Sequence, residues 1–166
     1  MKKITTNEIG NTIAEALAQK KKNILFVSNL LKYENLVAWF RKNNEYQLFR
    51  FAVPQPLAEE KNGLLYENEK YCVIDDETLT KLNSEKSIIF NLGFSEYSIN
   101  DFDGYLNILK GRFYINKFPD GVMVKHELEK MPLFIAFSTP SDKKGDWASL
   151  NEKYYDLFDE VYVLDV

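Results

Sequence analysis

Short apolar runs, separated by segments with helical periodicity, constrain the fold of this chain more than any other feature. Four such runs lie at residues 24–27, 88–90, 133–137 and 161–164. Strands that are apolar throughout are typical of a parallel sheet with both faces covered, because a strand with one solvated face alternates apolar and polar residues. Helical segments between the runs supply the crossovers that parallel strands need. We therefore expect a three-layer α/β fold, a parallel sheet with helices on both faces.

Local signals predict the remaining elements. A helix is expected from Thr5, because Thr5 and Glu8 have the spacing of a capping box. A β-hairpin is expected from two short apolar strands, 113–115 and 122–124, joined through Pro119-Asp120-Gly121. The other expected elements are a helix over 34–43, strands over 48–53 and 71–74, a helix that starts with Ser98 and Asp101, and a helix that starts with Ser149 and Glu152.

Size and composition predict one globular domain over residues 1–166. The chain is 45% apolar and 14% aromatic, which is typical of a protein with a packed core. A net charge of −4 provides no general attraction to nucleic acid. The single cysteine, Cys72, excludes an internal disulfide and fits a reducing compartment. Since no apolar run approaches the length of a membrane span or of a signal-peptide core, we expect a cytoplasmic protein that does not bind membranes.

The segment after the first apolar run has the layout of a phosphate-binding loop without its residues. Strand 24–27, the eight residues 28–35 and a helical pattern follow one another, as in the Walker A motif G-x-x-x-x-G-K-[ST]. The motif's two glycines fall on Ser28 and Tyr33, its lysine on Glu34 and its hydroxyl residue on Asn35. Such a loop needs glycines for close backbone approach and a cation for the phosphates. Because Glu34 reverses that charge, tight phosphate binding is not expected; a plain strand-to-helix turn is the alternative interpretation.

The C-terminal third resembles MoxR-like AAA+ ATPases. The resemblance is carried by Phe118-Pro-Asp-Gly-Val-Met-Val, by Phe134-Ile-Ala-Phe-Ser-Thr-Pro140, and by the spacing from Asp146 through Leu150 to Asp156-Leu-Phe158. In that family a hairpin, a strand ending in Asn-Pro and a helix ending in Asp-Arg-Phe follow in this order. With the Walker A layout, the resemblance runs from about residue 5 to 166 and stops where the family's helical lid would begin. It implies a P-loop NTPase-like fold, an AAA+ core with an inserted β-hairpin.

The resemblance also implies that every catalytic position of the family is substituted in this chain. ATP hydrolysis in such proteins depends on cations and on magnesium-binding carboxylates around the phosphates. We therefore expect a pseudo-ATPase that is not an enzyme and holds no cofactor. The substituted positions are Glu34 for the Walker A lysine, Asn35 for the adjacent hydroxyl, Asn91-Leu92 or Leu92-Gly93 for the Walker B pair, Thr139 for sensor 1 and Leu157 for the arginine finger.

Other candidate chemistry has a simpler structural interpretation. Asp75-Asp76-Glu77 is a dense acidic cluster, but it lacks the ligand spacing of a calcium loop and is interpreted as a solvated turn. Cys72 and the single histidine, His126, are a nucleophile and a base in principle. Cys72 lies in an apolar, strand-like run, which favours an inert core thiol. We expect no metal site and no catalytic residue.

The expected function is binding to another protein. Aromatic residues are enriched in the centres of interfaces, so Phe113, Tyr114 and Phe118 of the hairpin are the candidate partner contacts. Residues 54–87 are the second candidate region. An active AAA+ ATPase that this chain regulates or inhibits is one candidate partner, and nucleic acid is not expected as one. Two alternatives stay open: a nucleotide or small-ligand sensor that uses the vestigial cleft, and a phage or viral factor acting on a host nucleic-acid-associated complex. The sequence leaves the oligomeric state open.

Overall fold

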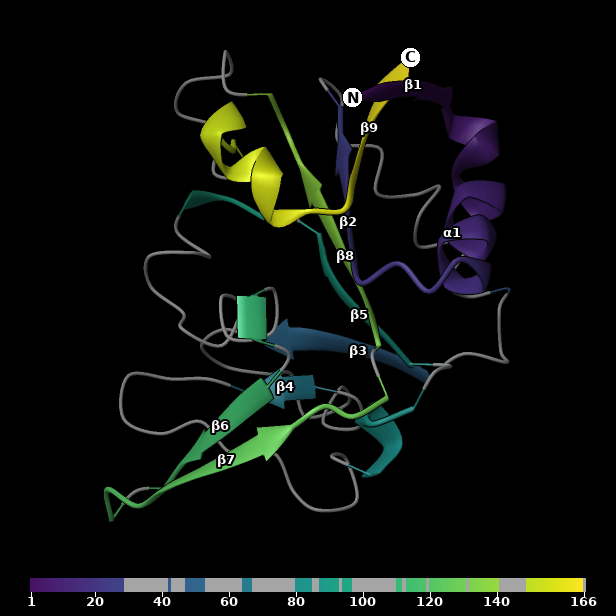
Figure 1. The fold of residues 1–166 in the computed structure, drawn as a ribbon. Helices are drawn as coiled ribbons and strands as arrows, with labels where there is room; N and C mark the ends of the chain where they lie inside the picture. Colours follow the sequence, from purple (N-terminus) through teal and green to yellow (C-terminus); the bar gives the residue numbers. More distant parts are fainter. Residues whose placement is uncertain are drawn as a thin grey trace.

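The computed structural model describes residues 1–28, 42, 47–52, 64–66, 80–84, 87–92, 94–96, 110–111, 113–118, 120–130, 132–140 and 149–165. The predicted strand over 71–74 and the helix expected to start at Ser98 lie outside these residues, and so does the helix over 34–43 apart from Lys42. The acidic cluster at Asp75 also lies outside them. Figure 1 shows how the described elements are arranged.

A parallel sheet forms the centre of the molecule (Figure 1). Its strands follow the order β1-β9-β2-β8-β5-β3-β4, and each neighbouring pair is parallel. The α/β fold and the parallel sheet that the apolar runs predict are therefore confirmed. The strands are β1 (Lys2–Thr5), β2 (Asn23–Val27), β3 (Gln47–Ala52), β4 (Leu64–Tyr66), β5 (Ser87–Leu92), β8 (Leu133–Ser138) and β9 (Glu160–Asp165).

Two apolar clusters lie on the two faces of this sheet. Successive side chains of a strand point to opposite faces, so β2 contributes Ile24 and Phe26 to one cluster and Leu25 and Val27 to the other. The first cluster also contains buried residues of helix α1 (Ile9–Ala18), which follows the short helix η1 (Thr6–Glu8). Half-buried side chains of helix η4 (Glu152–Leu157) pack against the second cluster. Helical segments therefore cover β2 from both sides.

A separate antiparallel hairpin projects away from the sheet (Figure 1). It consists of β6 (Phe113–Lys117) and β7 (Met123–Glu127), and its register runs from Phe113 opposite Glu127 to Lys117 opposite Met123. The Gly121 N–H donates to the Phe118 carbonyl at 3.0 Å, and Gly121 has a φ of 89°, a conformation that favours glycine. The predicted hairpin is confirmed, with strands longer than expected.

Strand β1 was not predicted, because its two exposed lysines hide the apolar pattern of a strand. The strand forms through its pairing with β9, in which Lys2 lies opposite Tyr162, and the Lys2 Nζ lies 3.3 Å from a carboxylate oxygen of Glu160. The predicted capping box directly after β1 is confirmed: the Glu8 carboxylate accepts the Thr5 N–H at 2.6 Å and the Thr5 hydroxyl at 3.0 Å. Strand β4 was also not predicted, and it lies within residues 54–87, the second candidate contact region.

The cap predicted for the last helix is wrong. Ser149 does not cap η4, because it forms an isolated bridge with Thr139 and its hydroxyl donates to the Pro140 carbonyl at 3.3 Å. Asn151 is the cap, and its side-chain oxygen accepts the Lys153 N–H at 3.0 Å. The segment is also a 3-10 helix, which is tighter than the α-helix that the sequence predicts.

Candidate functional site at the carboxyl ends of the central strands

The described candidates from the nucleotide motifs gather at the carboxyl ends of β2, β8 and β5. Val27, the last residue of β2, pairs with Ser138, the last residue of β8. Asn91 of β5 pairs with Ala136, two residues before the end of β8. Ser28, Asn91 and Thr139 therefore lie at the same edge of the sheet. In open parallel sheets this edge is where ligands bind.

Four other candidates from these motifs are not placed at this edge. Tyr33, Glu34, Asn35 and Gly93 lie outside the described residues. Leu92 ends β5, where its backbone pairs with Phe137. The charge at Glu34, on which the argument against phosphate depends, therefore stays a prediction from sequence.

Backbone hydrogen bonds continue past the ends of these strands and close the edge. The Ser28 N–H donates to the Ser138 carbonyl at 3.1 Å, and the Phe94 N–H donates to the Phe137 carbonyl at 2.8 Å. The Leu150 N–H donates to the Thr139 carbonyl at 3.2 Å. Of these groups, the Ser28 N–H belongs to the predicted loop, and its bond to β8 uses a main-chain donor that such a loop would otherwise have free for a phosphate.

Two buried hydroxyl groups at this edge have no hydrogen-bond partner within the described structure. Ser138 is 0% exposed and Thr139 is 1% exposed, and neither Ser138 Oγ nor Thr139 Oγ1 is bonded. Such a group costs about 1–3 kcal/mol when it is left unpaired. Because the two residues are consecutive, their side chains point to opposite faces of the sheet. The two hydroxyl groups therefore lie on opposite faces of the sheet, each covered by protein atoms.

The described side chains at this edge are neutral. Ser28, Asn91, Ser138 and Thr139 supply hydroxyl and amide groups, which donate and accept hydrogen bonds without a net charge. A triphosphate requires cations or a metal ion to offset its charge. The described part of the edge fits a neutral ligand better than a phosphate.

Leu157 does not lie with the other candidates. It ends η4, is half-buried and packs against the apolar cluster that contains Leu25 and Val27. Its carbonyl accepts a hydrogen bond from the Asn23 side-chain amide at 3.3 Å, and Asn23 is the first residue of β2. Leu157 therefore lies near the amino end of β2, at the opposite end of the strand from Ser28.

The three candidate partner contacts lie on or next to the hairpin strands. Phe113 is half-buried, and the Lys125 Nζ lies 4.4 Å from the centroid of its ring. Phe118 is half-buried at the turn, and its N–H donates to the Val122 carbonyl at 2.9 Å. The backbone of Tyr114 pairs with His126, while its side chain lies outside the described part of the structure.

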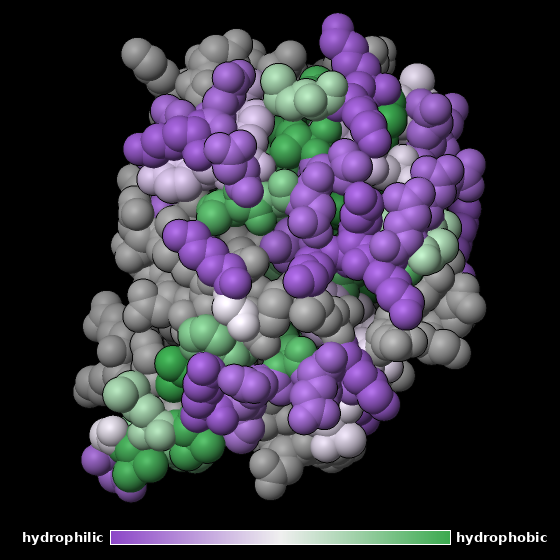
Figure 2. Space-filling view, viewed as in Figure 1, coloured by the Kyte–Doolittle hydropathy of each residue, from purple (hydrophilic) through white to green (hydrophobic). Residues whose placement is uncertain are grey.

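The tip of the hairpin carries exposed apolar residues that were not predicted as contacts. Val122 is 52%, Met123 67% and Val124 39% exposed. Figure 2 shows these hydrophobic residues gathered at the lower left, at the end of the hairpin. Their position after an Asp-Gly turn indicated a strand, and the run of three apolar residues was the available signal for a contact surface.

A cleft of about 630 Å³ lies beside the base of β7. The Lys130 N–H donates to Asn83 Oδ1 at 2.7 Å, which ties one wall of the cleft to the other. Both charge signs are present, so the cleft has no strong preference for an anion or a cation. The lining residues are Thr80, Asn83, Lys125, His126, Glu127, Leu128, Glu129 and Lys130.

Within the described residues, no group of three or more histidine, cysteine, aspartate or glutamate side chains is placed to hold a metal ion. Of the pair considered for nucleophilic catalysis, His126 lies on β7, whereas Cys72 falls outside the described residues. The pairing of Cys72 with His126 therefore stays a hypothesis from sequence.

No protein-family model, curated protein or solved structure matches this chain. In the part of the chain that the structure describes, no helix combines the length and the apolar composition needed to cross a bilayer.

Proposed function

We propose that this chain is a catalytically inactive protein with an AAA+-like core, a pseudo-ATPase that acts in the cytoplasm by binding another protein. The strand order supports the core assignment. In the order β9-β2-β8-β5-β3, the strand that leads into the Walker A position, β2, lies between β9 and β8. This is the order expected for an AAA+ core, with α1 and η4 as parts of two outer layers and the hairpin as an insertion between β5 and β8.

The neutral carboxyl edge supports the absence of catalysis. Asn91 and Leu92 end β5, where the resemblance would put the carboxylates of an ATPase, and Thr139 follows β8, where it would put sensor 1. Loss of an arginine finger alone lowers the rate of such enzymes by about 10³–10⁵. The carboxylates that bind magnesium are also missing from the predicted positions. ATP hydrolysis would therefore lack both the arginine and the metal ion that stabilise the charge on the phosphates.

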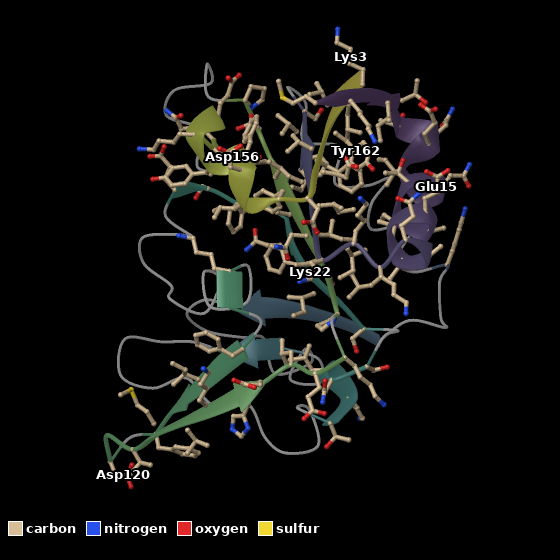
Figure 3. All side chains as sticks on the ribbon, in the orientation of Figure 1. Lys3, Glu15, Lys22, Asp120, Asp156 and Tyr162 are labelled. Carbon is tan, nitrogen blue, oxygen red and sulfur yellow. The ribbon has the colours of Figure 1, made fainter. Side chains whose placement is uncertain are left out.

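The observation that carries the binding function is the exposed apolar tip, Val122, Met123 and Val124. Apart from Met1, these are the large apolar side chains that are exposed in the described part of the chain. Contiguous exposed apolar residues mark interaction sites. Figure 3 places Asp120 at the far end of the hairpin, where its carboxylate accepts the Val122 N–H at 3.0 Å and fixes the turn. The partner would be a protein, with an active AAA+ ATPase as the specific candidate.

A comparison of two tagged variants tests this function. The double substitution Val122→Asp and Met123→Asp places charges on the tip and should abolish recovery of the partner from cell extract. The control, Ala14→Asp, places a charge on an exposed position of α1 and should leave recovery unchanged. Equal recovery by both variants would exclude the tip as the contact surface. Identification of the recovered protein then tests the ATPase assignment.

The unpartnered hydroxyls of Ser138 and Thr139 favour a second candidate function, a small-ligand sensor. They lie at the edge where open α/β sheets bind ligands. Calorimetric titration with adenosine, and with ATP or ADP in the presence of magnesium, tests it. Saturable binding of adenosine that Thr139→Val weakens would establish the sensor. Absence of heat from all three ligands would exclude a nucleotide sensor.

A further inference from the structure

The outer edge of β7 carries the further inference. The second sheet has two strands, so no strand in the described part of the structure pairs with the outer side of β7. Residues Val122–Lys125 and Glu127 are all exposed. An exposed strand edge presents unpaired N–H and carbonyl groups, which are a template for pairing with another strand.

The hairpin geometry fixes which residues of β7 offer their backbone to a partner. The Phe118 N–H donates to the Val122 carbonyl at 2.9 Å. Hydrogen-bonded pairs alternate along an antiparallel ladder, so the backbone groups of Val124 and His126 point toward β6. Those of Met123, Lys125 and Glu127 point toward the outer edge.

The charges on the outer edge of β7 are complementary to those of the same edge in a second, antiparallel copy. Lys125 and Glu127 lie on one face of β7, and the Lys125 Nζ lies 3.5 Å from a Glu127 carboxylate oxygen. When a second β7 runs antiparallel with the two-fold axis at His126, Lys125 of each copy faces Glu127 of the other. Both residues direct their backbone groups outward, so the register that pairs the charges also forms the hydrogen bonds.

The same register brings the apolar tip beside the cleft. Met123 and Val124 of one copy lie along Leu128 and Glu129 of the other. These two residues line the 630 Å³ cleft next to β7. The tip precedes His126 in the strand, and Leu128 and Glu129 follow it, so the tip of each copy meets Leu128 and Glu129 of the other, as an isologous interface requires.

We propose that β7 pairs with β7 of a second copy of this chain, antiparallel about His126, so that two hairpins form a four-stranded sheet. This inference rests on the hairpin being a binding surface, as the proposed function has it. An extended segment of another protein would use the same edge, but the alternation of Lys125 and Glu127 selects a second copy. A single strand edge buries little area, so the dissociation constant should be about micromolar or weaker.

Self-association over a range of concentrations, measured by sedimentation velocity, is the first test. The native chain should be a dimer at several hundred micromolar and dissociate on dilution. Lys125→Glu places like charges opposite each other twice and should weaken the dimer at least about tenfold. Adding Glu127→Lys to it should restore the dimer. Lys3→Glu, a matched change far from the hairpin (Figure 3), should have no effect.

Two further variants test the register. Lys125→Pro removes an N–H that points outward and leaves the ladder with β6 intact, so the dimer should be lost while the circular dichroism spectrum is retained. His126→Cys, in a Cys72→Ser background, should form a disulfide between copies, because facing residues at a non-hydrogen-bonded pair lie about 4.5 Å apart between Cα atoms. Glu15→Cys on α1 is the control and should not cross-link.

A monomer at several hundred micromolar, or a dimer that survives Lys125→Pro, would overturn the pairing. If the native chain is monomeric and the tip substitutions still abolish recovery of a different protein, the β7 pairing is overturned. The proposed function then remains in place. A dimer lost with Lys125→Pro and cross-linked through position 126 would establish it.

Discussion

The carboxyl edge of the central strands and the hairpin tip differ in burial, polarity and charge. The side chains of Ser28, Asn91, Ser138 and Thr139 at the edge are neutral, and the buried hydroxyls of Ser138 and Thr139 have no hydrogen-bond partner among the described residues. The tip is exposed and apolar, and β7 behind it carries both charge signs. The edge is where a parallel sheet ordinarily binds its ligand, whereas the tip belongs to a hairpin outside that sheet. The comparison favours the hairpin as the site of the proposed binding function, with the sheet as its support.

The largest expected effect is a difference in the free energy of unfolding between substitutions in the sheet core and at the hairpin tip. Phe134 is fully buried, and its ring centroid lies 6.1 Å from that of Phe94 in an edge-on arrangement. Phe134→Ala should lower the free energy of unfolding by about 3–5 kcal/mol through lost burial and a cavity. Met123→Ala, at an exposed position, should change it by less than about 0.5 kcal/mol. Urea titration of both variants measures the difference, and similar losses would mean that the tip is part of the core.

The second prediction concerns the unpaired hydroxyl of Thr139. Thr139→Val keeps the side-chain shape and removes a buried group without a partner, so the free energy of unfolding should rise by about 1 kcal/mol. Thr12→Val is the matched control, because the Thr12 hydroxyl donates to the Glu8 carbonyl at 2.8 Å. The control should lose stability. Loss of stability from Thr139→Val as well would show that its hydroxyl is bonded in solution.

The third prediction tests whether the conformation of the hairpin can be changed without affecting the sheet. A side chain added at Gly121 meets no atom within 4 Å, but its φ of 89° is unfavourable for residues other than glycine. Gly121→Ala should therefore destabilise the turn by about 1 kcal/mol, and Gly121→Asn should cost less because asparagine tolerates this conformation. Backbone amide NMR shifts should change over β6 and β7 only. Changes that reach β2 or β8 would contradict the separation.

The smallest expected effect is at Glu8 in the capping box. Hydrogen bonds from the Thr5 N–H and hydroxyl lower the pKa of Glu8 below its ordinary value of 4.5. A group with a lowered pKa stabilises the fold above its unfolded pKa, and that contribution is lost as the pH falls through the folded value. Glu8→Gln should therefore be less stable than the native chain at pH 7, and the difference should shrink at acidic pH. A difference that grows on acidification would contradict the assignment.

The sheet was predictable where local sequence decides it. The runs at β2, β5, β8 and β9 are apolar throughout, which only burial on both faces explains. Strand order was not predictable, because it depends on pairing between distant segments. Strand β1 was not predictable for the same reason. Lys2 and Lys3 break the apolar pattern of a strand, and β1 forms because it pairs with β9, which is distant in sequence. Ser149 has the sequence of a cap but is engaged by Thr139, a contact that sequence spacing does not reveal.

The sequence could indicate where the candidate residues lie in the sheet. It could not indicate whether their side chains are hydrogen-bonded or exposed. The carboxyl ends of parallel strands share one edge, so Ser28, Asn91 and Thr139 lie at the same edge in any sheet that contains β2, β5 and β8 as parallel strands. Whether a hydroxyl there has a partner depends on packing from other segments. The exposure of Met123 likewise depends on the direction in which the hairpin leaves the sheet. Both the hydrogen bonding and the exposure depend on contacts between segments distant in sequence, so residue spacing does not predict them.

The adjacency of β2 and β9 has a consequence for the emergence of the chain from the ribosome. β2 is synthesised well before β9, the neighbour that covers one of its edges. Until then an edge of an entirely buried strand remains open, and contacts between residues so far apart in sequence form slowly. Nascent chains that lack residues 160–165 should therefore expose Ile24–Val27 and depend on chaperones, and synthesis of β9 should end that dependence.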